Sequence, residues 1–477
     1  MTTTRDLTQF RNRLYRSLPG RGDALMDLLD ALSSNQGARS VVELSLSPAF
    51  RRCWPSISRT IDRYRSASKG TLEWAERCTQ EKSHRQAVAN LLEVPARRKH
   101  WLLAVDGTPY SRPHARCLTD RSIVHQSSPV SGRTPITIGH QYSLAVALPE
   151  KARSDEPAWV LPLSSRRVPS NKSPNTVGQE QMWALLDDPQ LPWYEELVVV
   201  MGDSAYSSRP FLGPLAPFHN LVSLTRVRSN RVFFRAPIET SRYWYGEKVS
   251  LSDADTWPEP AESRQFCHIA RSGKRYEIRV DRYTDLLMRG TREWKMNERP
   301  FDLLRVARYD ESGQRLLGKP MWLMLMGDRR AEIDSADAVA DYRQRFDQEH
   351  FHRFCRQRLL MDAYQTPETE HEENWIQLVC LAYTQLFAAR QLARQKLRPW
   401  ERKIRSAPHA LLSPTMVQRD FSRLLWELGT PARSPKPRNL GTGRRKGELQ
   451  GHRPRRAVVR KAKSPPQRAR APASNAA

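Results

Sequence analysis

The amino-acid sequence predicts an α/β protein built from several domains. Three observations lead to this fold class. Strand-like apolar runs alternate with helical patterns from Trp101 onward, a β-rich block follows, and helical patterns flank these parts on both sides. At about 100–200 residues per domain, a chain of 477 residues has room for more than one such unit.

Residues 1–95 are predicted to form a helical domain. Apolar residues recur at three-to-four spacing in stretches such as ALMDLLDALSS, and Gly, Ser and Pro separate these stretches. The segment is rich in arginine, notably Arg51, Arg52, Arg59, Arg63 and Arg65. Two interpretations stay open: a DNA-binding region, or a bundle with a solvated basic face that only supports the next domain.

Residues 96–227 are predicted to form the first part of an α/β core. WLLAV, ITIGHQYSLAVALP and ELVVVMG have strand character, and GQEQMWALLDD has helical character. Strands that alternate with helices indicate a sheet that is parallel in part.

Residues 228–332 are predicted to form a β-rich insertion, and residues 333–430 the helical second part of the core. The insertion contains VFFRAPI, KRYEIRVDRY, FDLLRVARYDE and MWLMLMG, separated by turn residues. Helical periodicity returns in SADAVADYRQRFDQEHFHRFCRQRLLMDAY and again in ENWIQLVCLAYTQLFAARQLARQ.

The charge of the chain indicates a polyanionic partner. Its 78 Lys and Arg residues exceed its 51 Asp and Glu residues by 27, and the commonest polyanions in a cell are nucleic acids. No run approaches the length of an apolar membrane span, and the N-terminus lacks the apolar core of a signal peptide. We therefore expect no membrane partner and a cytoplasmic location.

Residues 431–477 are predicted to be a disordered basic tail. This segment is rich in Pro, Gly and Ser, and Glu448 is its one acidic residue. It is either a non-specific DNA or RNA arm, whose affinity would fall steeply with salt, or a solubilising extension.

Two predicted strands are each followed by an aspartate, Asp106 after WLLAV and Asp203 after ELVVVMG. Sites of α/β proteins gather at strand ends. With a third acid, these carboxylates could hold two Mg²⁺ ions for phosphodiester chemistry. The six cysteines show no CxxC and no paired Cys/His spacing, which argues against zinc.

Helical geometry in YRQRFDQEHFHRFCR selects Glu349 as the third acid. At 100° per residue, Tyr342, Arg345, Glu349 and Arg356 fall within a stripe of about 60°, whereas Asp347 does not. Glu can bind the metal, Arg can grip phosphates, and Tyr can stack on a base or bond a phosphate. The alternative is an ordinary solvated face of an amphipathic helix.

These residues resemble the DDE transposases of bacterial insertion sequences, in the group with a Tyr-(2)-Arg-(3)-Glu-(6)-Lys signature. Tyr342, Arg345 and Glu349 match that spacing, and Arg356 replaces the lysine. The aspartates in VDGT and GDSAY, the segment LSLSPAFRRCWPSI and the segment PITIGHQYSLAVALP also look like family sequence.

The resemblance implies a ribonuclease H-like catalytic core, interrupted by the β-rich insertion. Asp106, Asp203 and Glu349 would be the catalytic residues and the ligands of Mg²⁺, with Mn²⁺ as a substitute. Tyr342, Arg345 and Arg356 would contact DNA. Some relatives stack a flipped base on an aromatic residue of the insertion, for which this chain offers four candidates: Trp244, Trp257, Trp294 and Trp322.

The function that follows is a DNA transposase that cuts element ends and joins them to target DNA. Its partners would be double-stranded terminal repeats and target DNA, and the family implies a dimer in the active complex. Two alternatives remain: a catalytically silent DNA-binding protein of transposase descent, and a ribonuclease H-like nuclease without transposition.

Overall fold

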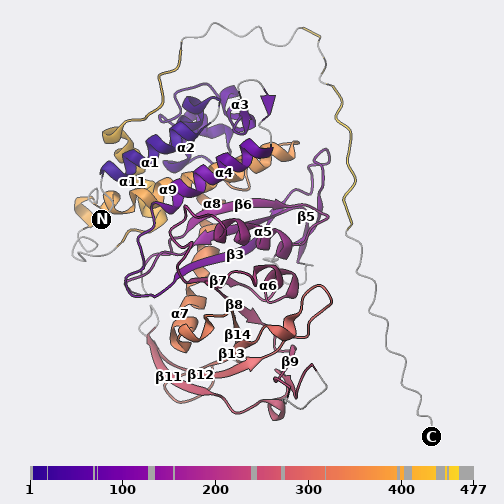
Figure 1. Ribbon diagram of the computed structural model, residues 1–477. Helices are drawn as coiled ribbons and strands as arrows, with labels where there is room; N and C mark the ends of the chain where they lie inside the picture. Colours follow the sequence, from indigo (N-terminus) through magenta and orange to yellow (C-terminus); the bar gives the residue numbers. More distant parts are fainter. Residues whose placement is uncertain are drawn as a thin grey trace.

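The computed structural model shows a mixed α/β protein. It describes residues 4–460 except 19, 68–69, 72–73, 127–134, 154–155, 238–243, 270–273, 317–318, 395–397, 402–410, 437–445, 448 and 450. Helices gather at one end, a large sheet crosses the middle, and the strands of the second half of this sheet form the other end (Figure 1). The predicted α/β class is confirmed.

The helical end combines the N-terminal helices with two helices from late in the chain. The N-terminal helices are α1 (Thr4–Ser17), α2 (Gly22–Ser33), α3 (Pro55–Asp62) and α4 (Trp74–Ala89), and the late ones are α9 (Thr369–Arg394) and α11 (Pro414–Leu428). Buried Arg11 on α1 donates to Asp30 on α2 at 2.5 Å and to Gln385 on α9 at 2.9 Å. The N-terminal segment is thus part of one helical layer with α9.

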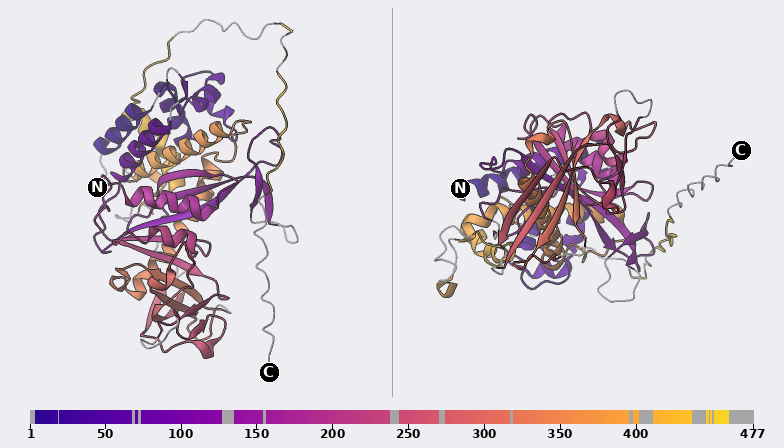
Figure 2. Two further views of the ribbon diagram at one scale, coloured as in Figure 1. Left: turned by 45° about the vertical axis from the view of Figure 1, so that its right-hand side comes forward. Right: turned by 90° about the horizontal axis from the view of Figure 1, so that it is seen from below.

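The central sheet has ten strands. Nine follow the order β11-β12-β13-β14-β8-β7-β3-β5-β4, and β6 pairs with β5. The strands that lie within the predicted core segment, residues 96–227, are β3 (Trp101–Ser111), β4 (Ser122–His125), β5 (Ile136–Ala147), β6 (Leu161–Val168), β7 (Val198–Gly202) and β8 (Leu221–Val227). Strand β3 is parallel to β7, which is parallel to β8, and antiparallel to β5. Figure 2 shows the twist of this sheet from below.

The strands of the predicted insertion continue this sheet. They are β11 (Glu262–Ile269), β12 (Arg275–Leu286), β13 (Phe301–Tyr309) and β14 (Met321–Met326), all antiparallel, and β14 pairs with β8. Two short pairs lie apart from it: β1 (Ser66–Ala67) with β2 (Gly70–Thr71), and β9 (Val232–Phe234) with β10 (Lys248–Ser250). The β-rich block therefore extends the core sheet.

Four helices accompany the sheet: α5 (Pro174–Leu186), α6 (Arg209–Leu215), α7 (Ser335–Gln344) and α8 (Phe346–Arg358). Ser173 caps α5 by accepting from the Thr176 amide at 3.1 Å, and Asp334 caps α7 by accepting from Ala336 at 2.8 Å. None of the described helices combines the length and apolar character that crossing a membrane requires.

Helices α5 and α8 cover opposite faces of β3. A Cβ at Gly178 on α5 would lie 3.1 Å from Val105 Cγ2, so Val105 faces α5. Side chains alternate along a strand, so the neighbouring Asp106 points to the other face, where α8 contacts β3. The geometry of this second face defines the candidate site.

Part of the C-terminal tail is hydrogen-bonded to the sheet. The amide of Val459 donates to Arg121 O at 2.7 Å, and Ser122 and Val459 form a parallel bridge beside β4. In Figure 2, left, this stretch of the tail runs beside the protruding strands. Residues 451–460 fall in the segment for which the sequence predicts disorder, yet they have defined partners; residues 461–477 lie outside the described chain.

Candidate active site at the centre of the sheet

The strand register places Asp106 and Asp203 side by side. Ala104 pairs with Met201 in the parallel ladder between β3 and β7, and the two aspartates each follow two residues later. Adjacent strands lie about 4.8 Å apart, and residues two apart point to the same face. Asp106 on β3 and Asp203 directly after β7 therefore lie near each other where the parallel pairing ends, and the charge of Asp203 acts on Asp106.

Strand β3 does not end at Asp106. It continues to Ser111, paired with β5 along this stretch, whereas the sequence interpretation placed Asp106 at the strand end. Its pairing with β7 stops at Ala104, so Asp106 lies just beyond the parallel part. The apolar run WLLAV marks that part because it is fully buried, and the less apolar continuation is held by the antiparallel partner.

Glu349 on α8 is connected to Asp106 by an ion pair that each of them forms with Arg345. The guanidinium of Arg345 lies 3.5 Å from Asp106 Oδ2 and 3.1 Å from Glu349 Oε1. Burial raises the pKa of Asp106 to about 6, opposed by Arg345 and assisted by the charges of Asp203 and Glu349. The structure thus brings all three predicted acids within one electrostatic neighbourhood.

The predicted single helical stripe is divided into two helices. Helix α7 ends at Gln344 and α8 begins at Phe346, because the amide of Gln348 donates to Arg345 O at 3.0 Å and tightens the turn. Tyr342 is 2% exposed and Arg345 is 7% exposed. These two residues are therefore buried beside the acids and do not form an open face.

Tyr342 packs against Arg345, with the guanidinium carbon 5.6 Å from the ring centre. Arg356, in the last turn of α8, donates to Pro109 O at 3.0 Å and to the Thr108 hydroxyl. Arg356 also lies 3.4 Å from Asp362. All four residues of the signature are thus fixed around β3, directly or through Arg345.

Other charged residues suggested by the sequence have structural partners. Asp347 lies 2.5 Å from Lys151, and Asp341 lies 2.7 Å from His100, so both are engaged away from the three acids. In the segment before α3, Arg51 and Arg52 both contact the buried Asp27 of α2. His352 on α8 is also buried, and burial lowers its pKa to about 3.

Tyr206 is a site residue that the sequence analysis did not single out. It follows Asp203 in GDSAY, is 2% exposed, and has its pKa raised by burial and by the charges of Asp106 and Asp203. A Cβ at Gly202 would lie 2.5 Å from Tyr206 Cβ, and one at Gly178 would lie 2.8 Å from its ring. Two glycines therefore leave space for this ring beneath the acids.

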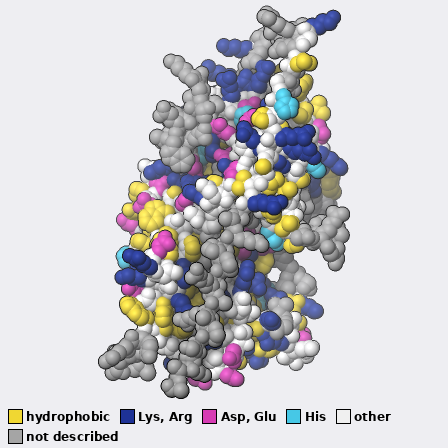
Figure 3. All heavy atoms as spheres, turned by 90° about the vertical axis from the view of Figure 1, so that its right-hand side faces the viewer, with side chains coloured by type: hydrophobic (Ala, Val, Ile, Leu, Met, Phe, Trp, Pro, Cys, Tyr) yellow, Lys and Arg dark blue, Asp and Glu magenta, His cyan; other side chains and the backbone are white. Residues whose placement is uncertain are grey.

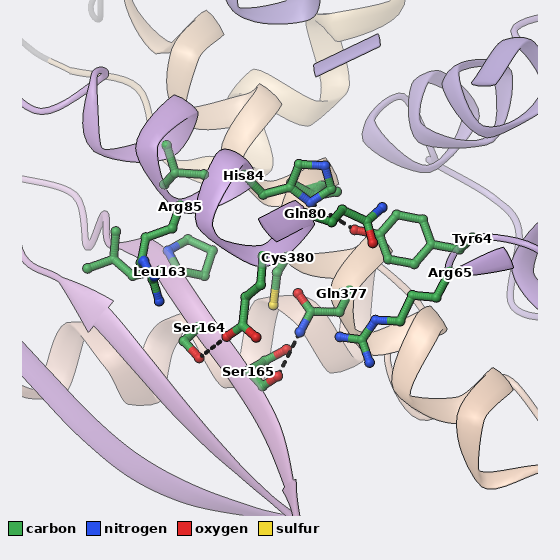
Figure 4. A pocket seen from close by; sticks show the side chains of 14 residues that line it. Tyr64, Arg65, Gln80, His84, Arg85, Leu163, Ser164, Ser165, Gln377 and Cys380 are labelled. Atoms are coloured by element: carbon green, nitrogen blue, oxygen red, sulfur yellow. Dashed lines mark hydrogen bonds between the residues drawn. The ribbon is translucent and has the colours of Figure 1, made fainter. Parts of the chain in front are cut away.

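A small cavity lies elsewhere, between α4, β6 and α9 (Figure 4). Its volume of about 30 Å³ is on the scale of single water molecules. His84 lines it, and burial lowers the pKa of this histidine to about 4, which keeps it neutral at pH 7. None of the three acids borders this cavity, and it is too small for a nucleic acid.

Comparison with known families gives one assignment. A family model described as "DDE superfamily endonuclease" matches residues 13–283, which is more than half of the chain. The chain belongs to this family. The match includes Asp106 and Asp203 and ends before Glu349. No curated protein matches the chain.

A DDE endonuclease family assignment indicates a nuclease or transposase role on DNA and a divalent metal requirement. Within the described parts of the chain, no three acidic, histidine or cysteine side chains are close enough to hold a metal ion as they are placed. The donor set nevertheless suits a hard divalent cation, because it consists of three carboxylates, and the charges of Asp203 and Glu349 help to raise the pKa of Asp106.

Proposed function

We propose that this protein is a DNA transposase that cuts element ends and joins them to target DNA. One observation carries the proposal: the charge of Asp203, which directly follows β7, acts on Asp106 of the parallel strand β3, and Arg345 links Asp106 to Glu349. These three acids would be the catalytic and metal-binding residues.

The proposed core is ribonuclease H-like. Strands β6, β5 and β3 are antiparallel neighbours, and β7 and β8 continue the same sheet in parallel with β3. The family assignment supports this interpretation, as does the placement of Asp106 on β3 and of Asp203 directly after β7. The strands β11–β14 would be the interruption between the second aspartate and the glutamate.

Asp106, Asp203 and Glu349 would hold Mg²⁺, or Mn²⁺ as a substitute. When bound, such ions stabilise the charge on the attacking and leaving oxygens of a phosphodiester. Asp106 must be ionised for this role, and its pKa of about 6 means that protons compete for it below neutral pH. Arg345 balances the negative charge of the acids in the protein alone.

Arg345 and Arg356 would hold phosphates of the bound strand. Both already lie at β3 beside the acids, and guanidinium groups bind phosphate oxygens in pairs. Tyr342 is proposed as a positioning residue, because its buried ring packs against Arg345. Direct contact between Tyr342 and DNA would need a rearrangement of the junction between α7 and α8.

Trp244 is the proposed aromatic partner for a flipped base. It is 71% exposed, whereas Trp322 is buried and packs edge-on against Trp257. Trp294 is partly buried and would lie 2.6 Å from a Cβ at Gly213. Of the four candidates, Trp244 has the free ring face that stacking needs.

Cleavage followed by strand joining tests the function. DNA carrying candidate terminal repeats would be incubated with Mg²⁺ and the full-length protein, with binding measured separately in EDTA. Wild type should nick the repeat ends and join them to a second duplex, and Asp203→Asn should bind equally well without cutting. Cleavage retained in Asp203→Asn would overturn the site assignment, and nicking without joining would favour a nuclease. We expect the joining complex to contain a dimer.

A further inference from the structure

The C-terminal residues 451–460 form a docked tail segment, which is hydrogen-bonded at the edge of the sheet beside β4. The amide of Arg456 donates to Arg116 O at 2.8 Å, and that of Val459 donates to Arg121 O at 2.7 Å. The bridge between Ser122 and Val459 is parallel. The segment thus pairs with the loop before β4 and with the first residue of this edge strand, as in strand addition.

Side chains fix the same position from two directions. The guanidinium of Arg121 is buried and donates to Arg112 O at 3.1 Å and to Arg456 O at 3.4 Å. Arg453 lies 3.1 Å from Glu368, just ahead of α9. Because the contacts come from both the sheet and the helical layer, the segment has a specific location on the surface.

The docked tail segment presents unpaired positive charge to solvent. Arg455, Arg456 and Arg460 are exposed, and none has an ion-pair partner among the described residues. Exposed Arg116 lies on the adjoining loop. Figure 3 shows many Lys and Arg side chains over the upper part of the face that lies on the right-hand side of Figure 1.

This cationic surface lies along the same strands as the acids. From Asp106, strand β3 continues for five residues to its end at Ser111. Ser111 of β3 and Ser122 of β4 both pair with Gly139 of β5. Five residues of strand span about 17 Å, which corresponds to about five base pairs at 3.4 Å each. Arg356 lies between the two, at Pro109.

We infer that the docked tail segment is a phosphate-binding element, which holds duplex DNA about five or more base pairs from the cleavage site. The ligand is the sugar-phosphate backbone of DNA, so the inference rests on the proposed function. In this inference the fixed position of the arginines contributes to DNA binding. A tail without a defined docking position would contribute only its charge.

The test compares three full-length variants for binding to a labelled duplex in EDTA, across a range of salt. Arg455→Gln/Arg456→Gln/Arg460→Gln removes three charges and keeps the backbone contacts. Lys461→Gln/Lys463→Gln/Arg468→Gln removes three charges from the sequence beyond the segment. Val459→Pro keeps every charge and removes the amide that donates to Arg121 O.

Arg455→Gln/Arg456→Gln/Arg460→Gln should make the negative slope of log affinity against log salt shallower by about 2.7. It should also weaken binding on the order of 100-fold near 0.15 M salt. Val459→Pro should weaken binding at least about tenfold and increase hydrogen exchange at Arg456. The second triple variant should have a smaller effect than the first. Unchanged melting temperatures would show that the variants remain folded.

Equal effects of the two triple variants, or wild-type binding by Val459→Pro, would overturn the inference, because the tail would then act through charge alone. If wild type binds duplex DNA and the first variant binds equally well, the inference fails while the proposed function stands. If wild type binds no DNA, the proposed function fails and the inference fails with it.

Discussion

The Arg345 guanidinium lies 3.5 Å from the Asp106 carboxylate, and its second terminal nitrogen lies 3.1 Å from Glu349. An internal cation therefore occupies the position between two acids that we propose as metal ligands. Like charges repel, so Arg345 would compete with a divalent ion for these carboxylates.

The first prediction concerns Arg345→Gln. Removing this cation should raise the affinity for Mn²⁺ in the absence of DNA by about tenfold or more, since one nearby charge changes the affinity of a carboxylate for a cation by this amount. Titration calorimetry with Mn²⁺ measures it. Arg329→Gln is the control, because Arg329 forms an exposed pair with Glu332. Unchanged or weaker Mn²⁺ binding would show that Arg345 does not compete with the ion.

The second prediction concerns the pH dependence of stability at Asp106. Its folded pKa of about 6 lies above the ordinary value of 3.8, so the folded state binds this proton more tightly than the unfolded state. The protonated group favours folding below about pH 4, and that contribution is lost as pH rises to about 6. Asp106→Asn should therefore exceed wild type in unfolding free energy by about 1–3 kcal/mol at pH 7.5.

Urea denaturation of both proteins without metal, at pH 7.5 and near pH 4, checks this prediction. The difference between the variants should shrink at the lower pH. A constant difference at both pH values would mean that charge at Asp106 does not oppose folding.

The third prediction concerns a buried network between β3, β5 and α9. Glu372 is fully buried and accepts from Arg112 at 2.9 Å and from His140 and Tyr142 at 2.7 and 2.8 Å. Glu372→Gln leaves the Arg112 charge without its carboxylate and should cost about 3–5 kcal/mol of unfolding free energy.

The exposed pair of Arg329 and Glu332 supplies the comparison. Glu332→Gln should change stability by about 1 kcal/mol or less. Equal, small effects of the two substitutions in chemical denaturation would refute a structural role for the network.

The fourth prediction separates two tryptophans. Trp244→Ala should leave stability within about 0.5 kcal/mol, because surface substitutions do little, and should slow strand cleavage through loss of base stacking. Trp322→Ala should cost about 3–5 kcal/mol, since Trp322 is buried. Denaturation and cleavage rates on the same substrate check both. Wild-type cleavage by Trp244→Ala would exclude the stacking role.

The sequence predicted the α/β class of the fold, and the three acids that it selected lie in one electrostatic neighbourhood, whereas their structural surroundings were not predicted. Apolar runs such as WLLAV identified β3 and β7 because buried strands are continuous in hydrophobicity. The proximity of Asp106 and Asp203 depends on the parallel ladder between β3 and β7, which a pattern along one chain does not contain. For the same reason, the sequence could not predict that β14 pairs with β8.

Helical periodicity grouped Tyr342 with Glu349 on one stripe of a single helix, but the two residues lie on different helices and Tyr342 is buried. The calculation assumes a straight helix, whereas the turn at Arg345 divides it. Burial of Tyr342 and His352 arises from packing against distant segments. The position of the docked tail segment on the sheet was likewise not predictable from the sequence. Its contacts are made by backbone groups whose partners lie more than 300 residues earlier in the chain.

Mg²⁺-dependent nicking by wild type and Glu349→Ala tests the central claim most directly, because Glu349 lies outside the family match and joins the site only through the fold. Supercoiled DNA carrying candidate terminal repeats is incubated with each protein, with Mg²⁺ or with EDTA, and Glu332→Gln serves as the charge-matched control. We predict nicking by wild type and by the control, no nicking by Glu349→Ala, and no nicking in EDTA. Nicking by Glu349→Ala at the wild-type rate, or nicking by wild type in EDTA, would contradict the account.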